Sequence, residues 1–383
     1  MSLSLGVQFT LLIGQTVPIP VPAAVSEALE SAEITHSDEG RSGFQLTFKV
    51  GREDASDLRD YDLVSNALIK PFSRVILVVT VNARPQVVMD GAITHHQFMP
   101  SNQAGGSKLI ITGEDISVMM DLEEKIVAYP ALPEAAIATK IISGYARYGL
   151  VPKVIPAKGD LPPLPTERIP VQHGTDLEHL QTLAKRHGYM FYVEPGPAPG
   201  ANVAYWGPPN RLGVTQPALS LDMGSSTNVE NLRFEYDSLA ASTVDGQVQD
   251  RKTNRSNPVA TRRSTRLPAL AKRSALKLQG RHVRQVLPNP IAGLTRGQAK
   301  AFAQGTINRS IDQVVTGEGE LSVVRYGQLL KARQTVGVRG CGDSYDGLYL
   351  VTKITHLIRS GEYRQQFTLA REGLGALLPV VRP

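Results

Sequence analysis

Three stretches of the chain begin with the same tripeptide, Ile-Thr-His, at residues 34, 93 and 354. After each tripeptide, a polar gap that contains glycine leads into a run of alternating apolar and polar residues. In the third run, Tyr363 and Phe367 lie on one side of the alternation. Because period two places alternate side chains on one face of a strand, each stretch is predicted to be a β-hairpin. Its first strand carries the tripeptide, and the sheet is antiparallel with one solvated face.

The N-terminal part of the chain shows further strand patterns. Continuous apolar runs at 73–81 and 85–95 are typical of buried strands, and 108–115 closes the group. These five or six strands predict a barrel or a sandwich. Because 90–115 is similar in pattern to 346–373, two similar β-domains are expected, with the first Ile-Thr-His hairpin as an extra one.

Between these strand groups the pattern becomes helical. One helix is predicted to begin at Pro133, a residue favoured in the first turn. A second helix has a capping box formed by Thr175 and Glu178, and Gly188 is expected to end it. A third helix is predicted at 295–311. Proline-rich linkers separate these elements.

The predicted fold is mainly β with α+β inserts: two similar antiparallel, tube-like β-barrel domains and a small α/β domain. In chain order, the predicted parts are a first barrel (1–118), a helical and α/β insert with proline-rich linkers (119–235), a second barrel (236–372) and a C-terminal tail (373–383).

The net charge of +6 is unevenly distributed. Residues 251–311 contain 14 Lys or Arg and no acid, which leaves 27 basic and 35 acidic residues elsewhere. A basic block of this kind indicates a polyanion or an acidic protein surface as partner. We expect the segment 251–284 to be an interaction arm, ordered only in an assembled particle. Its candidate contact residues are Arg251, Lys252, Arg255, Arg262, Arg263, Arg266, Lys272 and Arg273.

Nucleic acid is the alternative partner for this basic segment. The segment lacks the interleaved aromatic residues on which bases stack, so nucleic-acid binding is the less favoured hypothesis.

Cysteine content and the N-terminus indicate the compartment. With one cysteine, no intramolecular disulfide is possible, which fits a reducing compartment. The first basic residue is Arg41, so the basic start of a signal peptide is missing. No apolar run approaches the ~20 residues of a membrane-spanning helix. We expect a soluble protein that assembles in the cytoplasm and does not insert into membranes.

Catalytic and metal-binding patterns are not found in the sequence. His36, His95 and His356 occupy equivalent places but bring no second ligand at zinc spacing. Cys341 lies between glycines, and Trp206 lies in a Pro/Gly-rich stretch where a loop-anchoring role is expected. A carbohydrate-binding or peptidoglycan-acting protein would need an aromatic platform or a carboxylate pair. We therefore expect no catalytic residue, metal or cofactor, and no enzymatic activity.

Two stretches carry a family resemblance. Residues 175–196 and 345–372 resemble the helix–strand signature and the C-terminal strand pair of the phage late control D family. The matching residues are Asp176, Leu180, Gly188, Tyr192, Gly347, Tyr349, His356 and Phe367.

This family includes the central hub of contractile phage baseplates and the hub part of the valine-glycine repeat spike proteins of type VI secretion. The resemblance implies a homotrimer whose six barrels form a pseudo-sixfold ring. That ring would receive the sixfold tail tube, or a tube-initiator protein, while its other end holds a trimeric spike. Baseplate wedge or adaptor proteins are further implied partners, in a virion or an injection particle. Which contractile machine this is stays open.

The chain ends where fused relatives continue into a spike, so a separate spike polypeptide is expected. The apolar tail would dock it, unless the tail folds back onto the second barrel. The tail residues expected in this contact are Leu374, Leu377, Leu378, Val380 and Val381.

Overall fold

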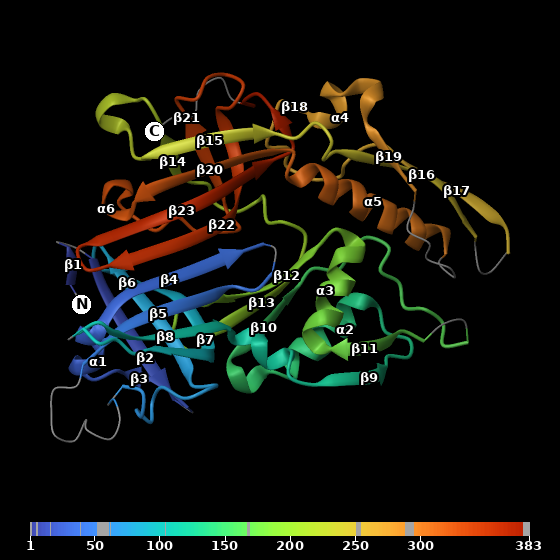
Figure 1. Cartoon of the computed structure of the whole chain (residues 1–383). Coiled ribbons are helices and arrows are strands. Elements are labelled where there is room, and N and C mark those ends of the chain that lie inside the picture. The colour runs from blue at the N-terminus through green and yellow to red at the C-terminus, as the bar shows by residue number, and fades with distance from the viewer. Residues whose placement is uncertain are drawn as a thin grey trace.

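The computed structural model describes residues 2–4, 7–15, 17–38, 40–51, 61, 63–103, 105–166, 169–249, 254–287 and 295–377. Its body is one mainly antiparallel sheet of 14 strands (Figure 1). The strand order is β1-β2-β6-β7-β8-β5-β4-β22-β23-β20-β15, with β3 on β2 and the pair β14–β21 on β22.

The N-terminal half of the sheet consists of β1 (Ser2–Ser4), β2 (Val7–Gly14), β3 (Ile19–Pro20), β4 (Leu29–Ser37), β5 (Gly43–Val50), β6 (Arg74–Val81), β7 (Arg84–Met99) and β8 (Ser107–Asp115), with the short helix α1 (Ala23–Ala28). The C-terminal half consists of β14 (Gln216–Ser220), β15 (Asn231–Tyr236), β20 (Val315–Ser322), β21 (Thr335–Arg339), β22 (Gly347–Arg359) and β23 (Glu362–Arg371), with α6 (Val323–Tyr326).

All three Ile-Thr-His stretches form the predicted hairpins, as β4–β5, β7–β8 and β22–β23. The first and third copies also pair with each other, because β4 and β22 are antiparallel neighbours. Thr35 lies opposite Thr355, and Ile34 lies opposite His356. The first hairpin therefore lies at the seam between the two halves, beside the third.

The two separate barrels expected from the sequence are not found. Within the described residues, no strand pairing closes either half into a barrel. The physical reason is the β4–β22 ladder, which joins the two halves into one continuous sheet. A single apolar core spans both halves, with Phe44 and Leu46 from one and Ile354 and Phe367 from the other. Burying each such side chain contributes about 1.5–3 kcal/mol.

A small α/β unit, here called the insert, follows the first half. Its elements are the 3₁₀ turn η2 (Ile116–Met120), β9 (Glu124–Ala128), α2 (Glu134–Ser143), η3 (Ala146–Tyr148), β10 (Leu150–Val154), β11 (Val171–Thr175), α3 (Asp176–His187), β12 (Met190–Pro195) and β13 (Asn202–Gly207). They form a β10-β13-β12 sheet and a β11-β9 ribbon.

Local signals in the insert are realised as predicted, with one exception. Both hydrogen bonds of the Thr175–Glu178 capping box are present, and Gly188 ends α3 in the left-handed conformation. Trp206 does not anchor a loop. It lies in the central strand β13, fully buried, and its Nε1 donates to the backbone oxygen of Leu180 at 3.2 Å.

A second small unit, here called the basic lobe, follows β15. It consists of β16 (Ser242–Gln249), β17 (Ser256–Thr261), β18 (Arg273–Ser274), α4 (Ala275–Leu278), η5 (Gly280–His282), β19 (Arg284–Val286) and α5 (Arg296–Asp312). The sheet β17-β16-β19 packs on α5 around Val244, Val259 and Ile307. Most of the segment 251–284, expected to be an interaction arm, therefore lies in strands and short helices, because its few apolar residues pack against α5.

Strand β14 and all but the last residue of β15 fall inside the predicted insert 119–235, but they pair with β21 and β20 of the C-terminal half. The short strand β24 (Gly373–Leu374) returns the chain to the basic lobe by pairing with β18. The predicted domain boundaries themselves remain predictions.

Candidate assembly surface

Eight adjacent strands, β7-β8-β5-β4-β22-β23-β20-β15, present one solvated face, which we call the polar face. The strand registers place its side chains in ladders across both halves. From β7 to β15 they are His95, Gln97, Met99, Lys108, Ile110, Thr112, Glu114, Gln45, Thr47, Lys49, Ser31, Glu33, Thr35, Ser37, Lys353, Thr355, Leu357, Arg359, Glu362, Arg364, Gln366, Thr368, Thr316, Glu318, Glu320, Ser322, Asn231, Arg233 and Glu235. Basic and acidic residues are equal in number on this face, and few members are apolar.

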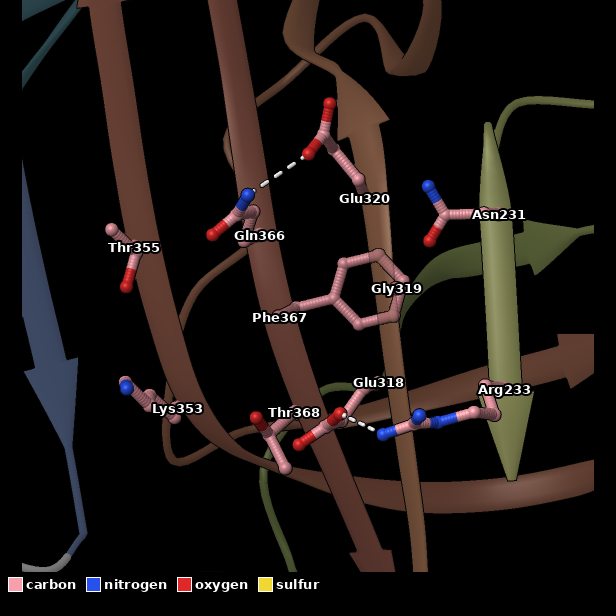
Figure 2. A pocket seen from close by; sticks show the side chains of 10 residues that line it. All are labelled: Asn231, Arg233, Glu318, Gly319, Glu320, Lys353, Thr355, Gln366, Phe367 and Thr368. Atoms are coloured by element: carbon pink, nitrogen blue, oxygen red, sulfur yellow. Dashed lines mark hydrogen bonds and ion pairs between the residues drawn. The ribbon is translucent and has the colours of Figure 1, made fainter. Parts of the chain in front are cut away.

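A shallow groove of about 490 Å³ lies on this face over β15, β20, β23 and β22 (Figure 2). Arg364 donates to Glu320 at 2.7 Å, and Gln366 donates to the same carboxylate at 3.0 Å. These two hydrogen bonds lower the pKa of Glu320. Arg233 pairs with Glu318 at 2.9 Å. The groove is thus a solvated surface whose charges neutralise one another.

No catalytic constellation accompanies this surface in the described part of the chain. No group of three His, Cys, Asp or Glu residues there could hold a metal ion. Burial, and then Asp346, raises the pKa of Cys341 to about 11, so the thiol is neutral near pH 7.

At the seam between the two halves, the first and third tripeptides meet. Thr35 and Thr355 share a hydrogen bond of 3.1 Å on the polar face. On the opposite face, the rings of His36 and His356 meet edge to face at 5.7 Å. Burial, and then the charge of Arg333, lowers the pKa of His36 to about 4. The pKa of His356 is also lowered, by burial and then by His36, so both imidazoles are neutral at pH 7.

Arg333 joins three parts of the molecule and was missed by the sequence analysis. Its guanidinium lies 3.9 Å from the ring centre of Tyr192 in the insert. It also donates to the backbone oxygen of Ser37 at 2.7 Å and pairs with Asp38 at 3.5 Å. Nothing local in the sequence marks this arginine, because its partners come from β4 and β12.

The residues that carry the family resemblance hold the fold together. Asp176 accepts hydrogen bonds from Lys125, Tyr145 and Gln172 at 2.7–2.8 Å. The others lie in the core, at turns or at junctions between parts: Leu180, Gly188, Tyr192, Gly347, Tyr349, His356 and Phe367.

A buried ionic cluster links the insert, the basic lobe and the end of β23. Arg211 pairs with Asp312 at 2.9 Å and with Glu372 at 3.0 Å. Arg266 pairs with the same Asp312 at 2.5 Å. Arg266 was predicted to contact partners, but its side chain is only 6% exposed. It is directed inward because Asp312 neutralises it.

Other predicted contact residues lie in different settings. Among the basic residues, those that are exposed are Arg255, Arg262, Arg263, Lys272 and Arg273. In the tail, Leu374 is half-buried in β24, and Leu377 is 48% exposed. Those that lie outside the described residues are Arg251, Lys252, Leu378, Val380 and Val381.

In the part of the chain that the structure describes, no helix is long and apolar enough to cross a membrane. No protein-family model matches the chain, and no curated protein matches its sequence.

Solved structures with the same fold are found despite low sequence identity. A tail protein from Neisseria meningitidis MC58 is 14% identical, with a TM-score of 0.62 over 97% of this chain and 98% of that one. A 43 kDa tail protein of prophage MuSo2 from Shewanella oneidensis is 15% identical, with a TM-score of 0.61 over 95% and 99% of the two chains.

A type VI secretion component from E. coli, described as similar to the T4 phage tail proteins gp27 and gp5, is 12% identical. Its TM-score is 0.52 over 92% of this chain and 77% of that one. The chain therefore has the fold of phage tail proteins and of a type VI secretion component.

Proposed function

We propose that this chain is the baseplate hub of a contractile injection machine, a phage tail or a device derived from one. Three copies form a ring that adapts a sixfold tail tube to a separate trimeric spike. The protein acts through surfaces and carries out no catalysis. The observation that supports this proposal most directly is the eight-stranded polar face with two related halves.

Both ends of the eight-stranded sheet offer hydrogen-bonding edges. Among the described residues, no strand pairs with the outer edge of β15, nor with β7 beyond Ile93. Unpaired edges are templates for pairing with another chain. Because eight strands alternate in direction, β15 runs antiparallel to β7. Rotation about an axis near the strand direction would therefore bring β15 of one copy beside β7 of the next in antiparallel pairing.

Three copies would close a cylinder of about 24 strands. At about 4.8 Å between strands, its backbone diameter is about 40 Å, and strand tilt widens it further. The polar face lines the interior of this cylinder. A solvated, charge-balanced lining suits a channel that transmits material without binding it.

The proposal is tested by coexpressing the chain with candidate tube and spike proteins and measuring the native mass of the complex. A complex with three hubs and three spike chains is expected. A complex with two or six hubs would overturn the trimeric ring. A soluble catalytic activity without any such assembly would overturn the structural role.

The C-terminal tail is proposed to dock the spike. Because Gly373 and Leu374 already pair with β18, the contact is expected from Leu377 onward. A chain ending at Ala376 should assemble but lose the spike in copurification. Full retention of the spike would contradict this role, whereas loss of solubility would favour a tail that folds onto its own sheet.

A further inference from the structure

The insert and the basic lobe form one peripheral block that runs alongside the sheet (Figure 1). The insert lies at the β7 end, where Asn202 of β13 donates to Asp90 of β7 at 2.9 Å. The basic lobe lies at the β15 end, because β16 follows β15 and α5 packs against β23. Helices α3 and α5 join the two units at the glycine pair Gly188 and Gly305.

The outer margin of the basic lobe is positively charged. Elements β18, α4 and β19 form this margin, on the side away from the insert (Figure 1). Four exposed basic residues recur along it at intervals of three or four: Arg273, Lys277, Arg281 and Arg284. Residues 273–287 contain no acid, and no ion pair is found for these four residues in the described chain. Leu287, next to them, is 80% exposed.

The opposite margin of the block, on the insert, is acidic and apolar. It is the β9–β11 ribbon, which lies at the far edge of the insert (Figure 1). Glu123 and Glu124 are exposed there. Lys125 pairs with Asp176 at 2.8 Å and with Glu123 at 3.5 Å, so these three acids outnumber the one lysine. Ile126 on the same ribbon is 78% exposed. The two margins are thus complementary in charge, and each has an exposed aliphatic side chain.

We propose that the basic margin of the lobe docks against the β9–β11 ribbon of a second copy of this chain. The inference rests on the proposed ring. When the β15 edge of one copy meets the β7 edge of the next, the lobe of the first comes beside the insert of the second. The contact is head to tail, so it recurs at every subunit boundary and closes with the ring. Its opposite charges fix the partner and the register of the copies.

Charge reversal tests this contact. One variant carries Lys277→Glu, Arg281→Glu and Arg284→Glu, and a second carries Glu123→Lys and Glu124→Lys. Each is expected to weaken self-association at least tenfold in analytical ultracentrifugation, and the combined variant is expected to recover most of it. Raising the salt concentration should also weaken self-association of the unmodified protein. The matched control, Arg255→Glu with Lys300→Glu, changes exposed charges elsewhere on the lobe and should associate normally.

Two outcomes separate this inference from the proposed function. If the copies still join through β7 and β15, as judged by a disulfide between Gln97→Cys and Arg233→Cys, but neither reversal weakens association, the docking contact is wrong and the ring stands. If no such disulfide forms and the protein stays monomeric at every concentration, both are wrong. Weakening by each reversal without recovery in the combined variant would also overturn the pairing of these two margins.

Discussion

Single residues at the seam explain how the two halves stay joined. His36 and His356 are buried against each other, with Arg333 close by. Nε2 of His36 lies 2.7 Å from the backbone oxygen of Val88, which can only accept, so this nitrogen carries the proton of a neutral ring. A neutral imidazole pair packs at this seam, whereas a protonated pair would place like charges in the core.

The seam should therefore weaken in acid. Unfolded histidine binds a proton below about pH 6.5, but His36 in the fold does so only near its pKa of about 4. The unfolded state thus gains protons first, and the free energy of unfolding falls as the pH drops through this window. His36 alone accounts for about 3 kcal/mol, and His356 adds to the loss in the same direction.

Urea unfolding of the protein and of His36→Asn between pH 7 and pH 4.5 checks this prediction. The variant should lose less stability across the window than the unmodified protein. The exposed His173 on the ribbon supplies the control, since His173→Gln should lose as much unfolding free energy between pH 7 and pH 4.5 as the unmodified protein. An equal loss of unfolding free energy in the unmodified protein and in His36→Asn would contradict the role of His36.

The buried ionic cluster gives a second prediction at this scale. Asp312→Asn leaves Arg266 without its carboxylate and Arg211 with only Glu372. Removing one partner of a buried pair costs about 3–5 kcal/mol, because the remaining charge stays desolvated. The matched control is Glu318→Gln, whose pair with Arg233 is largely exposed and worth about 1 kcal/mol or less. Similar unfolding midpoints for the two variants would show that the cluster is not buried as described.

Among the elements, helices α3 and α5 are held together by two glycines. A Cβ on Gly305 would lie 2.6 Å from the backbone oxygen of Arg186 and 2.7 Å from the amide nitrogen of Gly188. Gly305→Ala is expected to cost about 1–3 kcal/mol, because backbone must move to make room. Gly297 lies in the same helix with open space around it, so Gly297→Ala should be neutral or stabilising by about 1 kcal/mol at most.

Thermal unfolding and amide exchange of α5 check the glycine prediction. The alanine at Gly305 should lower the unfolding temperature and speed up exchange in α5, whereas the alanine at Gly297 should do neither. Unchanged or slower exchange in the Gly305→Ala variant would contradict the close contact with α3, because alanine by itself raises helix propensity.

Elements with local signals could be predicted from the sequence, and those without could not. The hairpins could be predicted because period-two alternation and a turn mark them locally. The capping box could be predicted because Thr175 and Glu178 lie within one helical turn. The strand that holds Trp206 was missed because prolines and glycines surround it. The ladder that sets Thr35 opposite Thr355 joins residues 320 positions apart, and no local pattern encodes it. Likewise, Arg266 was read as a surface charge because Asp312 is distant in sequence.

At the scale of the whole molecule, the two related halves and the continuous sheet that joins them would both favour a ring with six similar positions. Each copy would contribute two related sixths of the wall, joined at the β4–β22 ladder, so three copies would present six similar places. The peripheral block would follow the same path outside the wall. The proposed ring thus depends on copies meeting edge to edge, β15 of one beside β7 of the next.

The most direct test is a disulfide between those two edges. One chain would carry Gln97→Cys and Arg233→Cys, with Cys341→Ser to remove the native thiol, and neighbouring positions on β15 would scan the register. Chains with only one of the two new cysteines serve as controls and should give at most dimers. On oxidation, a ring of three predicts a denaturing-gel ladder that ends at three chains and converts to a circular trimer. A ladder that continues beyond three, or a product that stops at two, would contradict the hub ring.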